Sequence, residues 1–349
     1  MPAPTLPALL RLLCLTLALF LSACGDGPLV RQESFVFGTR VEVVSYGSPE
    51  AEARTALNAV LREFDRLHRS YHAWQPSELT SLNAAIAAGK STPVSPEMLS
   101  LLQASQRYAE LSDGLFDPAI GKLIELWGFH GDSFTPHLPE PAALQAAIAA
   151  APSVRQLSLQ GELVRSSNRA VNLDFGGIAK GYALDRAAAI LSQHGIKNAL
   201  INIGGNVMAL GAKGKQPWSV GIQHPRASGP LATLALYDGE AIGTSGDYQR
   251  FFEFEGQRYS HLIDPRTGVP AKHTAALTVL VTPRENAGML SDVASKPLFL
   301  AADDWPAMAR RFEIRHALRV DAAGHISLTP DMRARLRWAD GAGPATVVE

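Results

Sequence analysis

The chain has 349 residues, a length that suits one large domain or two ordinary ones. Hydrophobic residues make up 46% of it and charged residues 19%, which is enough apolar content for a sizeable core. The 32 basic and 33 acidic residues give a formal net charge of −1, so no basic excess is available to bind a nucleic acid backbone, and we set that partner class aside.

The first expected element is a short apolar segment at residues 12–21. Its length of about ten residues is too short for a stable membrane span and is typical of a secretion signal. The segment leads into Leu-Ser-Ala-Cys, ending at Cys24, which resembles the bacterial lipobox, where the signal is cut before the cysteine and the thiol is lipidated. We therefore expect a lipoprotein signal peptide at residues 1–23 and a lipidated tether at residues 24–32. The alternative is an ordinary secretory signal that happens to precede a cysteine.

The chain contains two cysteines, and this count fits a lipoprotein. Cys14 lies in the signal and Cys24 would carry the lipid, so the mature domain would have neither a disulfide nor a cysteine nucleophile. We expect a bacterial membrane lipoprotein that faces the periplasm. The sequence leaves the choice between inner and outer membrane open, because Asp26 does not directly follow the cysteine, where the sorting rules place it.

The remaining elements follow from apolar periodicity and from turn-forming residues. In chain order we expect a strand at 34–45 with Gly38 and Thr39 inside it, helices at 49–68, 96–111, 117–127 and 139–151, strands at 154–159 and 163–165, a helix at 180–194, strands at 199–203, 218–222, 231–236, 258–262 and 276–281, a helix at 290–302, and a hairpin at 316–320 and 325–328. Strands and helices mix without strict alternation, which favours an α+β fold. No long linker interrupts residues 33–340, so we expect one composite domain followed by a C-terminal tail at 341–349.

Four segments combine glycines with polar residues, a composition typical of functional loops. The first, at residues 172–185, ends a strand, turns at Gly176 and Gly177, and starts a helix near Lys180. Free N–H groups at a helix start and a nearby lysine would suit a phosphate, although a strand–turn–helix without a ligand is the plain alternative. The second, at residues 202–206, has a glycine pair after a buried strand and is a weak signal by itself.

The third segment joins residues 244–248 to residues 259–270. His261 precedes Asp264 by three positions and could be a general base with an orienting carboxylate. The alternative is that Asp264 caps the turn and that His261 is a strand residue whose hydrogen bonds are satisfied.

The fourth segment, at residues 291–297, places Asp292 and Ser295 three positions apart on one helical turn. Their side chains therefore share a face. Oxygen ligands of this kind suit Mg²⁺.

Together these segments resemble the ApbE family of FAD:protein FMN transferases. The resemblance covers nearly the whole mature chain, through the motifs FGT from Phe37, DGLFDP, LDFGGIAKGYALD, NIGGN, TSGDY and HLIDPRTGVP. It implies an α+β domain, related to the T-fold, with mixed sheets and flanking helices. It also implies an enzyme that uses Mg²⁺ to split FAD, attaches the FMN half to a threonine of an acceptor flavoprotein and releases AMP. The implied acceptors are flavoproteins of the Rnf, Nqr or Nos type, or extracytoplasmic reductases.

The resemblance further implies roles for single residues. The implied contacts to the flavin nucleotide are Phe37, Trp74, Leu115, Phe116, Asp117, Asp174, Lys180 and Ile263, with Trp74 where the family usually has a stacking tyrosine. The implied metal ligands are Gly177, through its main-chain oxygen, Asp292, Ser295 and Lys296. The candidate catalytic residues are His261 as the base, Asp292 and Lys180.

Lys296 departs from the family pattern, which commonly has a metal-ligating threonine there. An ammonium group cannot ligate a cation. Ser295 and water could complete the metal shell, Lys296 could supply positive charge in place of part of the metal's role, or the protein could bind FAD and transfer poorly. Two other functions therefore stay open, a non-enzymatic FAD-binding periplasmic lipoprotein and a metal-dependent FAD pyrophosphatase.

Overall fold

The computed structural model describes residues 27–348, apart from residues 132, 134 and 342. The expected signal peptide and Cys24 lie outside the described residues. Within the described part of the chain, no helix combines the length and the apolar character needed to cross a membrane.

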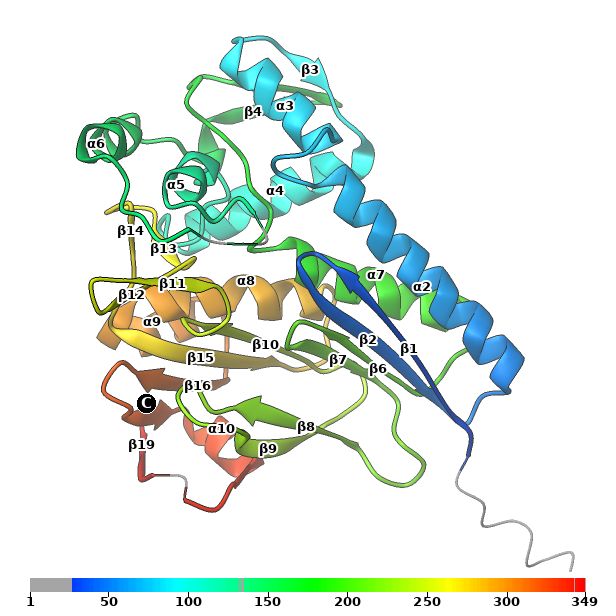
Figure 1. The fold of residues 1–349 in the computed structure, drawn as a ribbon. Coiled ribbons are helices and arrows are strands. Elements are labelled where there is room, and N and C mark those ends of the chain that lie inside the picture. The colour runs from blue at the N-terminus through cyan, green and yellow to red at the C-terminus, as the bar shows by residue number, and fades with distance from the viewer. Residues whose placement is uncertain (1–26, 132, 134, 342, 349) are drawn as a thin grey trace, which may run out of the picture.

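A nine-stranded sheet runs through the molecule (Figure 1). In spatial order its strands are β1 (Leu29–Val36), β2 (Thr39–Tyr46), β6 (Ala199–Ile203), β7 (Asn206–Leu210), β10 (Ala241–Gly246), β15 (Thr274–Val281), β16 (His316–Asp321), β17 (Ile326–Leu328) and β19 (Ala345–Val347). Neighbouring strands are antiparallel, except that β17 and β19 run parallel. All eight residues of β15 are buried, as expected of a central strand whose two faces are both covered.

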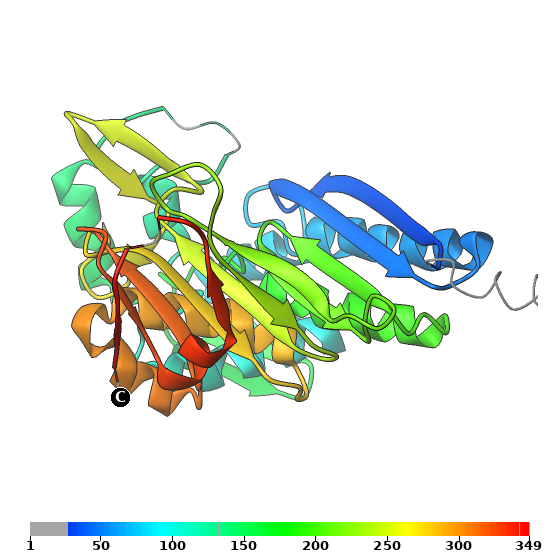
Figure 2. The ribbon, with the colours of Figure 1, turned by 90° about the horizontal axis from the view of Figure 1, so that it is seen from below.

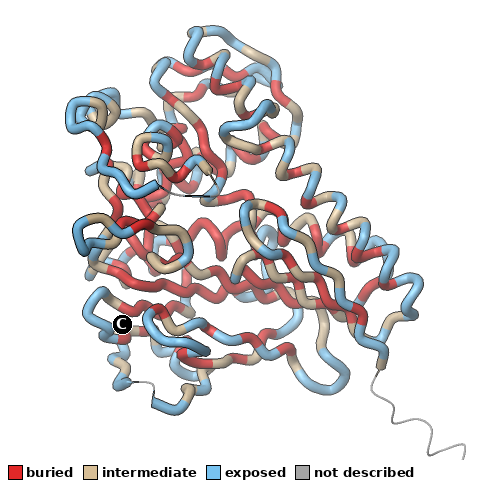
Figure 3. Tube along the Cα trace, viewed as in Figure 1, coloured by how far each residue is buried: buried red, intermediate tan, exposed pale blue. Residues whose placement is uncertain are grey.

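Helices cover one face of this sheet, and a smaller sheet covers the other. The helices are α2 (Glu50–Ser70), α7 (Ala179–Gln193), α8 (Ala287–Leu300) and α9 (Trp305–Arg311), and in Figure 2 the strands lie in front of them. The smaller sheet consists of β8 (Trp218–Gln223), β9 (Pro230–Leu236) and β18 (Leu336–Trp338), with α10 (Pro330–Arg335) beside it. Helix α8 packs on β10 and β15, and Figure 3 shows buried residues along α8 and the middle of the sheet. The main core therefore lies directly beneath α8.

Most of the rest of the chain forms a cap above α7 and α8, and the hairpin that follows β10 lies beside α8 (Figure 1). These elements are α3 (Glu78–Ala87), β3 (Thr92–Pro93), α4 (Pro96–Leu111), α5 (Gly121–Leu126), α6 (Pro141–Ala149), the 3₁₀ turn η2 (Val154–Gln156), β4 (Leu157–Gln160) and β5 (Leu163–Ser166), together with the hairpins β11 (Phe251–Phe254)–β12 (Gln257–Ser260) and β13 (Ile263–Asp264)–β14 (Val269–Pro270). A further 3₁₀ turn, η3 (Ala302–Asp304), links α8 to α9. The boundary between this cap and α8 is where polar motif residues gather.

The expected α+β class is confirmed, and helix α4 has the expected bounds. The strand expected at 34–45 is instead a hairpin, because Phe37 and Gly38 both adopt positive φ angles (57° and 66°) and form a two-residue turn. The two chain ends also differ from expectation. Residues 29–32, expected in the tether, pair within β1, and residues 345–347, expected in the tail, pair with β17.

Two expected helices begin at other residues than expected. In each case a carboxylate side chain binds backbone N–H groups near the start of the helix. The helix expected at 117–127 begins only at Gly121, since the Asp117 carboxylate accepts the N–H of Ala119 and holds a turn there. The helix expected at 290–302 begins at Ala287. The Asp185 carboxylate on α7 accepts the N–H groups of Gly288 and Met289 in the first turn of α8, at 2.8 Å each, and so provides a cap from another helix.

Candidate functional site

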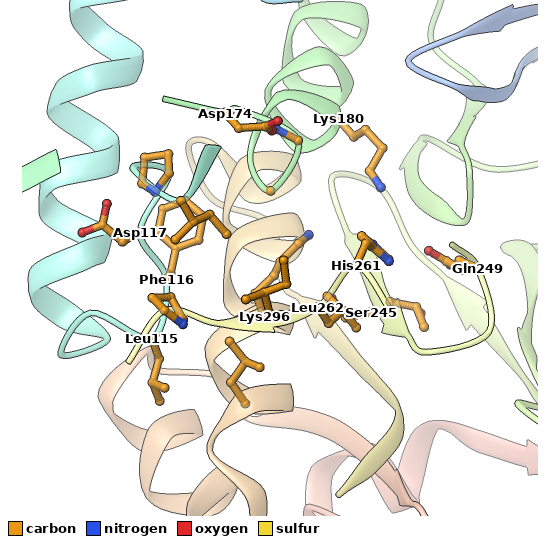
Figure 4. Close-up of a pocket in the computed structure, with 18 residues that line it drawn as sticks. Leu115, Phe116, Asp117, Asp174, Lys180, Ser245, Gln249, His261, Leu262 and Lys296 are labelled. Atoms are coloured by element: carbon orange, nitrogen blue, oxygen red, sulfur yellow. The ribbon is translucent and has the colours of Figure 1, made fainter. Parts of the chain in front are cut away.

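A pocket lies between the cap and α8, and Figure 4 shows the side chains that line it. Its lining residues are Leu115, Phe116, Asp117, Pro118 and Ile120, then Asp174, Gly176, Gly177 and Lys180, then Thr244, Ser245 and Gln249, then His261, Leu262, Ile263 and Pro265, and finally Lys296 and Leu300. Three of the four glycine-rich and polar segments identified in the sequence therefore meet here. The DGLFDP motif joins them. The NIGGN segment does not line the pocket, and its Gly204 packs against Thr39 of the β1–β2 hairpin.

The first wall of the pocket is the turn that leads into α7. The carboxylate of Asp174 is buried and accepts the N–H of Gly176 at 2.7 Å, and burial raises the pKa of this carboxyl group. Asn83 fixes the preceding residue, because its side-chain amide both donates to and accepts from the main chain of Leu173, at 2.9 and 2.8 Å. Lys180 follows in the first turn of α7 and faces the pocket.

The start of α7 has fewer free N–H groups than its sequence suggests. The N–H groups of Ile178 and Ala179 both donate to the carbonyl of Phe175, and the N–H of Gly181 donates to Asp292. The ammonium of Lys180, rather than a fan of helix N–H groups, therefore gives this wall its attraction for an anion.

The second wall is α8, where Asp292 and Lys296 form an ion pair one helical turn apart. Asp292 is fully buried, and its Oδ2 accepts the N–H of Gly181 at 2.8 Å while its Oδ1 pairs with the Lys296 ammonium. Burial alone would raise the pKa of Asp292, but the ammonium groups of Lys296 and Lys180 hold this pKa below its usual value. Helix α7 can come close enough to α8 for this hydrogen bond because the two helices cross at glycines. A Cβ on Gly181 would lie 2.5 Å from the Gly288 oxygen.

Ser295 and Gly177 occupy different positions around this ion pair. The Ser295 hydroxyl is buried, 2.7 Å from Ser245 Oγ and 2.8 Å from the Asp292 main-chain oxygen, so it ties α8 to β10. Gly177 lies over the Lys296 side chain, since a Cβ there would be 3.9 Å from Lys296 Cε. Of the four implied metal ligands, Gly177 and Lys296 line the pocket. Asp292 and Ser295 are not among its lining residues.

The third wall carries His261, immediately after β12. Its Nδ1 lies 3.1 Å from the main-chain oxygen of Arg250, and because a carbonyl only accepts, we assign the ring proton to Nδ1 and the free lone pair to Nε2. Burial, with the positive charges of Arg250 and Lys180, lowers the pKa of His261 to about 3. The imidazole is therefore neutral near pH 7.

Asp264 does not orient His261. Its carboxylate binds the Arg266 guanidinium, with Oδ2 2.7 Å from Nη2, and accepts the Arg266 main-chain N–H at 2.9 Å. Of the two alternatives, the expectation of an orienting carboxylate is wrong, and the turn-capping role of Asp264 is the one the structure shows. The group that fixes the His261 ring is the main-chain oxygen of Arg250.

The residues expected to contact FAD are only partly brought together. Leu115, Phe116 and Ile263 line the pocket with the residues above. Asp117 also lines it, but its carboxylate is held by the Ser153 hydroxyl at 2.6 Å and the Val154 N–H at 2.9 Å, which indicates a structural role for the charged group.

Phe37 and Trp74 do not line the pocket. Phe37, at the hairpin turn, packs edge-on against Phe64 and His68, and Trp74 is 40% exposed and contacts His72 and His130 edge-on. Trp74 does not line this pocket, so it could not stack on a ring bound inside it.

Two residues at the site escaped the sequence analysis. Gln249 lines the pocket, and Arg250 holds His261 through its carbonyl while its guanidinium binds the main-chain oxygens of Phe129 and Gly131, at 2.8 and 3.1 Å. Both directly follow the TSGDY motif, so their proximity to that motif was an available signal. The main-chain contact of Arg250 had no side-chain signature.

The implied Mg²⁺ ligands do not form a site that fits the ion. The described residues contain no group of three or more His, Cys, Asp or Glu side chains placed to hold a metal. Asp292 is the one carboxylate in the implied set, and both of its oxygens already receive a hydrogen bond, from Gly181 and from Lys296. A divalent cation at this carboxylate would also face the Lys296 ammonium directly, and like charges in a buried setting repel strongly.

Comparison with known proteins relates the whole domain to one family. A model of the ApbE family matches residues 37–318. The chain is 44% identical over 321 residues to the FAD:protein FMN transferase of Rhodobacter capsulatus, a match that covers 92% of this chain and 61% of that protein, so the chain spans about three fifths of that relative's length. It is 33% identical over 285 residues to the FAD:protein FMN transferase of Treponema pallidum, covering 75% of this chain and 77% of the relative.

Solved structures show the same relationship. The crystal structure of the ApbE protein from Thermotoga maritima matches with a TM-score of 0.81 at 31% identity, covering 89% of this chain and all of that one. The flavinyl transferase ApbE of Pseudomonas stutzeri matches with a TM-score of 0.73 at 29% identity, covering 85% of this chain and 92% of that one. The resemblance identified from the sequence motifs is thereby confirmed at the level of the fold.

Proposed function

The chain belongs to the ApbE family, and on that basis we propose that it transfers the FMN moiety of FAD to a threonine side chain of an acceptor flavoprotein and releases AMP. The observation that carries the proposal is the pocket in which Lys180, Lys296 and His261 point toward one another from three separate walls (Figure 4). Two ammonium groups beside one neutral imidazole suit a reaction in which a hydroxyl attacks a phosphoanhydride.

The pyrophosphate of FAD would lie between the two lysines. Lys180 approaches from α7 and Lys296 from α8, and both side chains line the same pocket. Apolar side chains of Leu115, Phe116 and Ile263 line the rest of the pocket and would contact the nucleotide outside its phosphates.

The transfer itself is a single displacement at phosphorus. The threonine oxygen of the acceptor forms a bond to the phosphorus on the flavin side, and the bond from that phosphorus to the bridging oxygen breaks. The bridging oxygen leaves with the electron pair as part of AMP, and the threonine proton passes to Nε2 of His261, whose pKa the negative charge of the bound pyrophosphate raises from its low value. Lys180 and Lys296 stabilise the charge that builds on the phosphoryl and leaving oxygens. The Mg²⁺ expected from the resemblance has no step here, because the residues implied as its ligands do not fit it.

The proposal includes a location for the mature protein. The apolar segment at 12–21 and the Leu-Ser-Ala-Cys sequence ending at Cys24 support a lipid anchor and a position at the periplasmic face of a bacterial membrane. There its acceptor would be a flavoprotein of the Rnf, Nqr or Nos type or an extracytoplasmic reductase. Support for these acceptors comes from the family resemblance.

An in-gel fluorescence assay tests the proposal and separates it from its two alternatives. The mature protein is incubated with FAD and an acceptor that carries the target threonine, and the same acceptor with that threonine changed to alanine is the matched control. We expect a fluorescent acceptor band, absent from the control, that survives denaturation. Free FMN and AMP without acceptor labelling would instead indicate a pyrophosphatase, and tightly bound, unchanged FAD would indicate a binding protein.

A further inference from the structure

On the basis of the flavin transfer proposed above, we infer that the Lys296 ammonium supplies the positive charge that a bound metal would otherwise supply at this site. It stands where the resemblance implies a divalent metal, so this chain transfers flavin without one. Four features of the described residues lead to this inference.

The first feature is that Lys296 uses both of the oxygens that Asp292 could offer to a metal on this side. Its Nζ pairs with Oδ1 of Asp292 and also donates to the Asp292 main-chain oxygen at 2.7 Å. The other carboxylate oxygen takes the Gly181 N–H at 2.8 Å. A metal would have to displace an ammonium held by two bonds inside its own helix.

The second feature is the position of the side chain. Lys296 runs from α8 to the turn at Gly177, where a Cβ would lie 3.9 Å from its Cε. Gly177 and Asp292 are two of the groups implied to bind a metal. Lys296 pairs with Asp292 through its ammonium and lies beside Gly177 along its side chain.

The third feature is the number of donors on the ammonium group. A lysine ammonium has three N–H bonds, and the two contacts to Asp292 use two of them. The third is free to point into the pocket, where the Lys296 side chain is 15% exposed and faces Lys180 and His261 (Figure 4). The same group can thus stay anchored on α8 and donate to a phosphate oxygen.

The fourth feature is the balance of charge. Asp292 and Lys296 neutralise each other, and Lys180 adds a positive charge beside them. These three groups carry a net charge of +1, so they attract the pyrophosphate of FAD, which has a negative charge on each phosphate, without a metal. A divalent cation here would stand beside two ammonium groups among buried groups, where Coulomb repulsion is strong.

The test compares the wild-type mature chain with Lys296→Thr, which restores the residue type that ligates metal in the family pattern. Lys122→Thr is the matched control, because Lys122 also pairs with a carboxylate on its own helix, Glu125, but at an exposed position. Three readouts are taken in EDTA and with added Mg²⁺ or Mn²⁺. They are Mn²⁺ binding followed by electron paramagnetic resonance, the melting temperature, and the rate of acceptor flavinylation.

We expect the wild type and Lys122→Thr to bind no Mn²⁺ in the pocket, to melt at the same temperature in EDTA and in Mg²⁺, and to flavinylate at equal rates in both. We expect Lys296→Thr to melt lower in EDTA, to regain stability with Mg²⁺, to bind one Mn²⁺, and to transfer about 100-fold more slowly in EDTA than the wild type.

Two results would overturn the inference. One is stoichiometric Mn²⁺ binding by the wild type, which needs no variant and no acceptor. The other is loss of wild-type transfer in EDTA with recovery on adding Mg²⁺. A complete absence of flavinylation under every condition would instead refute the proposed transferase function, while the Mn²⁺ titration would still decide the role of Lys296.

Discussion

At the scale of single residues, the Asp292–Lys296 pair sets the electrostatics of the pocket. A fully buried carboxylate is costly to hold in its charged form unless a partner and hydrogen bonds compensate it. Here the Lys296 ammonium and the Gly181 N–H provide that compensation. Removing one member of such a pair is therefore expected to cost more than removing both.

Lys296→Met tests that expectation. It leaves the Asp292 carboxylate buried without its ammonium, and we expect the free energy of unfolding to fall by about 3–5 kcal/mol in urea denaturation. The double variant Asp292→Asn, Lys296→Met removes both charges and should recover most of the loss. Equal stability of Lys296→Met and the wild type would show that the pair does not compensate a buried charge.

His261 gives a second prediction at this scale, through pH. The unfolded chain protonates this imidazole near its usual pKa of about 6.5, whereas the folded chain holds its pKa at about 3. Between these values the unfolded state binds more protons, so the contribution of His261 to stability is present above about pH 6.5 and is lost as the pH falls. We expect His261→Gln to lose less stability than the wild type between about pH 6.5 and pH 4 in denaturant titrations. The same pH slope in both proteins would contradict the low pKa.

At the scale of elements, the site depends on how three segments are fixed to one another. The turn before α7 is tied to α3 by Asn83, α7 is tied to α8 by the Asp185 cap and the glycine crossing, and α8 is tied to β10 by Ser295 and Ser245. The elements that carry Lys180, Ser245 and Lys296 thus have their relative positions set by these hydrogen bonds.

Asn83→Ala should loosen the first of these ties. Asn83 lies 90 residues from Leu173 and satisfies both the N–H and the carbonyl of that residue, so its loss leaves two buried backbone groups unpaired. We expect a loss of about 1–3 kcal/mol in stability for each unpaired group and a weaker affinity for FAD, measured by quenching of flavin fluorescence. Asn83→Asp is a useful companion, since it keeps the acceptor for the Leu173 N–H and should retain more affinity than alanine. Unchanged FAD affinity in both variants would separate Asn83 from the site.

Local patterns explain which elements were predictable from the sequence. Helix α4 has its expected bounds because its own residues mark them, with Ser95 accepting the N–H of Met98 at 3.1 Å and Pro96 in the first turn. The start of α8 was missed because its cap, Asp185, lies on another helix. The β1–β2 turn was missed because the alternating pattern continues through it, and a positive φ at Phe37 is unusual for a large side chain.

The site was predictable to the same extent. The motifs around Lys180, His261 and Lys296 pointed to residues that do meet in one pocket. The partners of those residues were less predictable, because His261 is held by a main-chain oxygen and Asp117 by a loop 36 residues away. The four-residue spacing of Asp292 and Lys296 does indicate an ion pair, although the family pattern suggested metal ligands at both positions.

At the scale of the whole molecule, one sheet joins the two ends of the described chain. Strand β1 forms one edge and β19 the other, with the pocket helices packed across the middle. The C-terminal strand pairs in parallel with β17, and the N–H of Val348 adds a hydrogen bond to Leu328 at 2.9 Å. The C-terminal segment therefore covers a sheet edge that would otherwise expose unpaired backbone groups.

Ending the chain at Gly341 tests this role. Removal of β19 exposes the edge of β17 and should lower the melting temperature, by about 2–4 °C for each kcal/mol of lost stability, and increase aggregation at high concentration. A variant that keeps the full length but carries Thr346→Ala at the strand centre is the control and should melt close to the wild type. An unchanged melting temperature after truncation would show that the pairing of β19 does not stabilise the sheet edge.

The central claim is that this pocket moves FMN from FAD onto a threonine, and intact-mass spectrometry of the acceptor tests it most directly. After incubation with FAD, the acceptor should gain the mass of one FMN less one water, peptide mapping should place it on a threonine, and AMP should appear in equal amount. His261→Ala should slow this gain by about 100-fold or more while still binding FAD. An acceptor whose mass stays unchanged while FAD is bound, or while free FMN accumulates, would contradict the account.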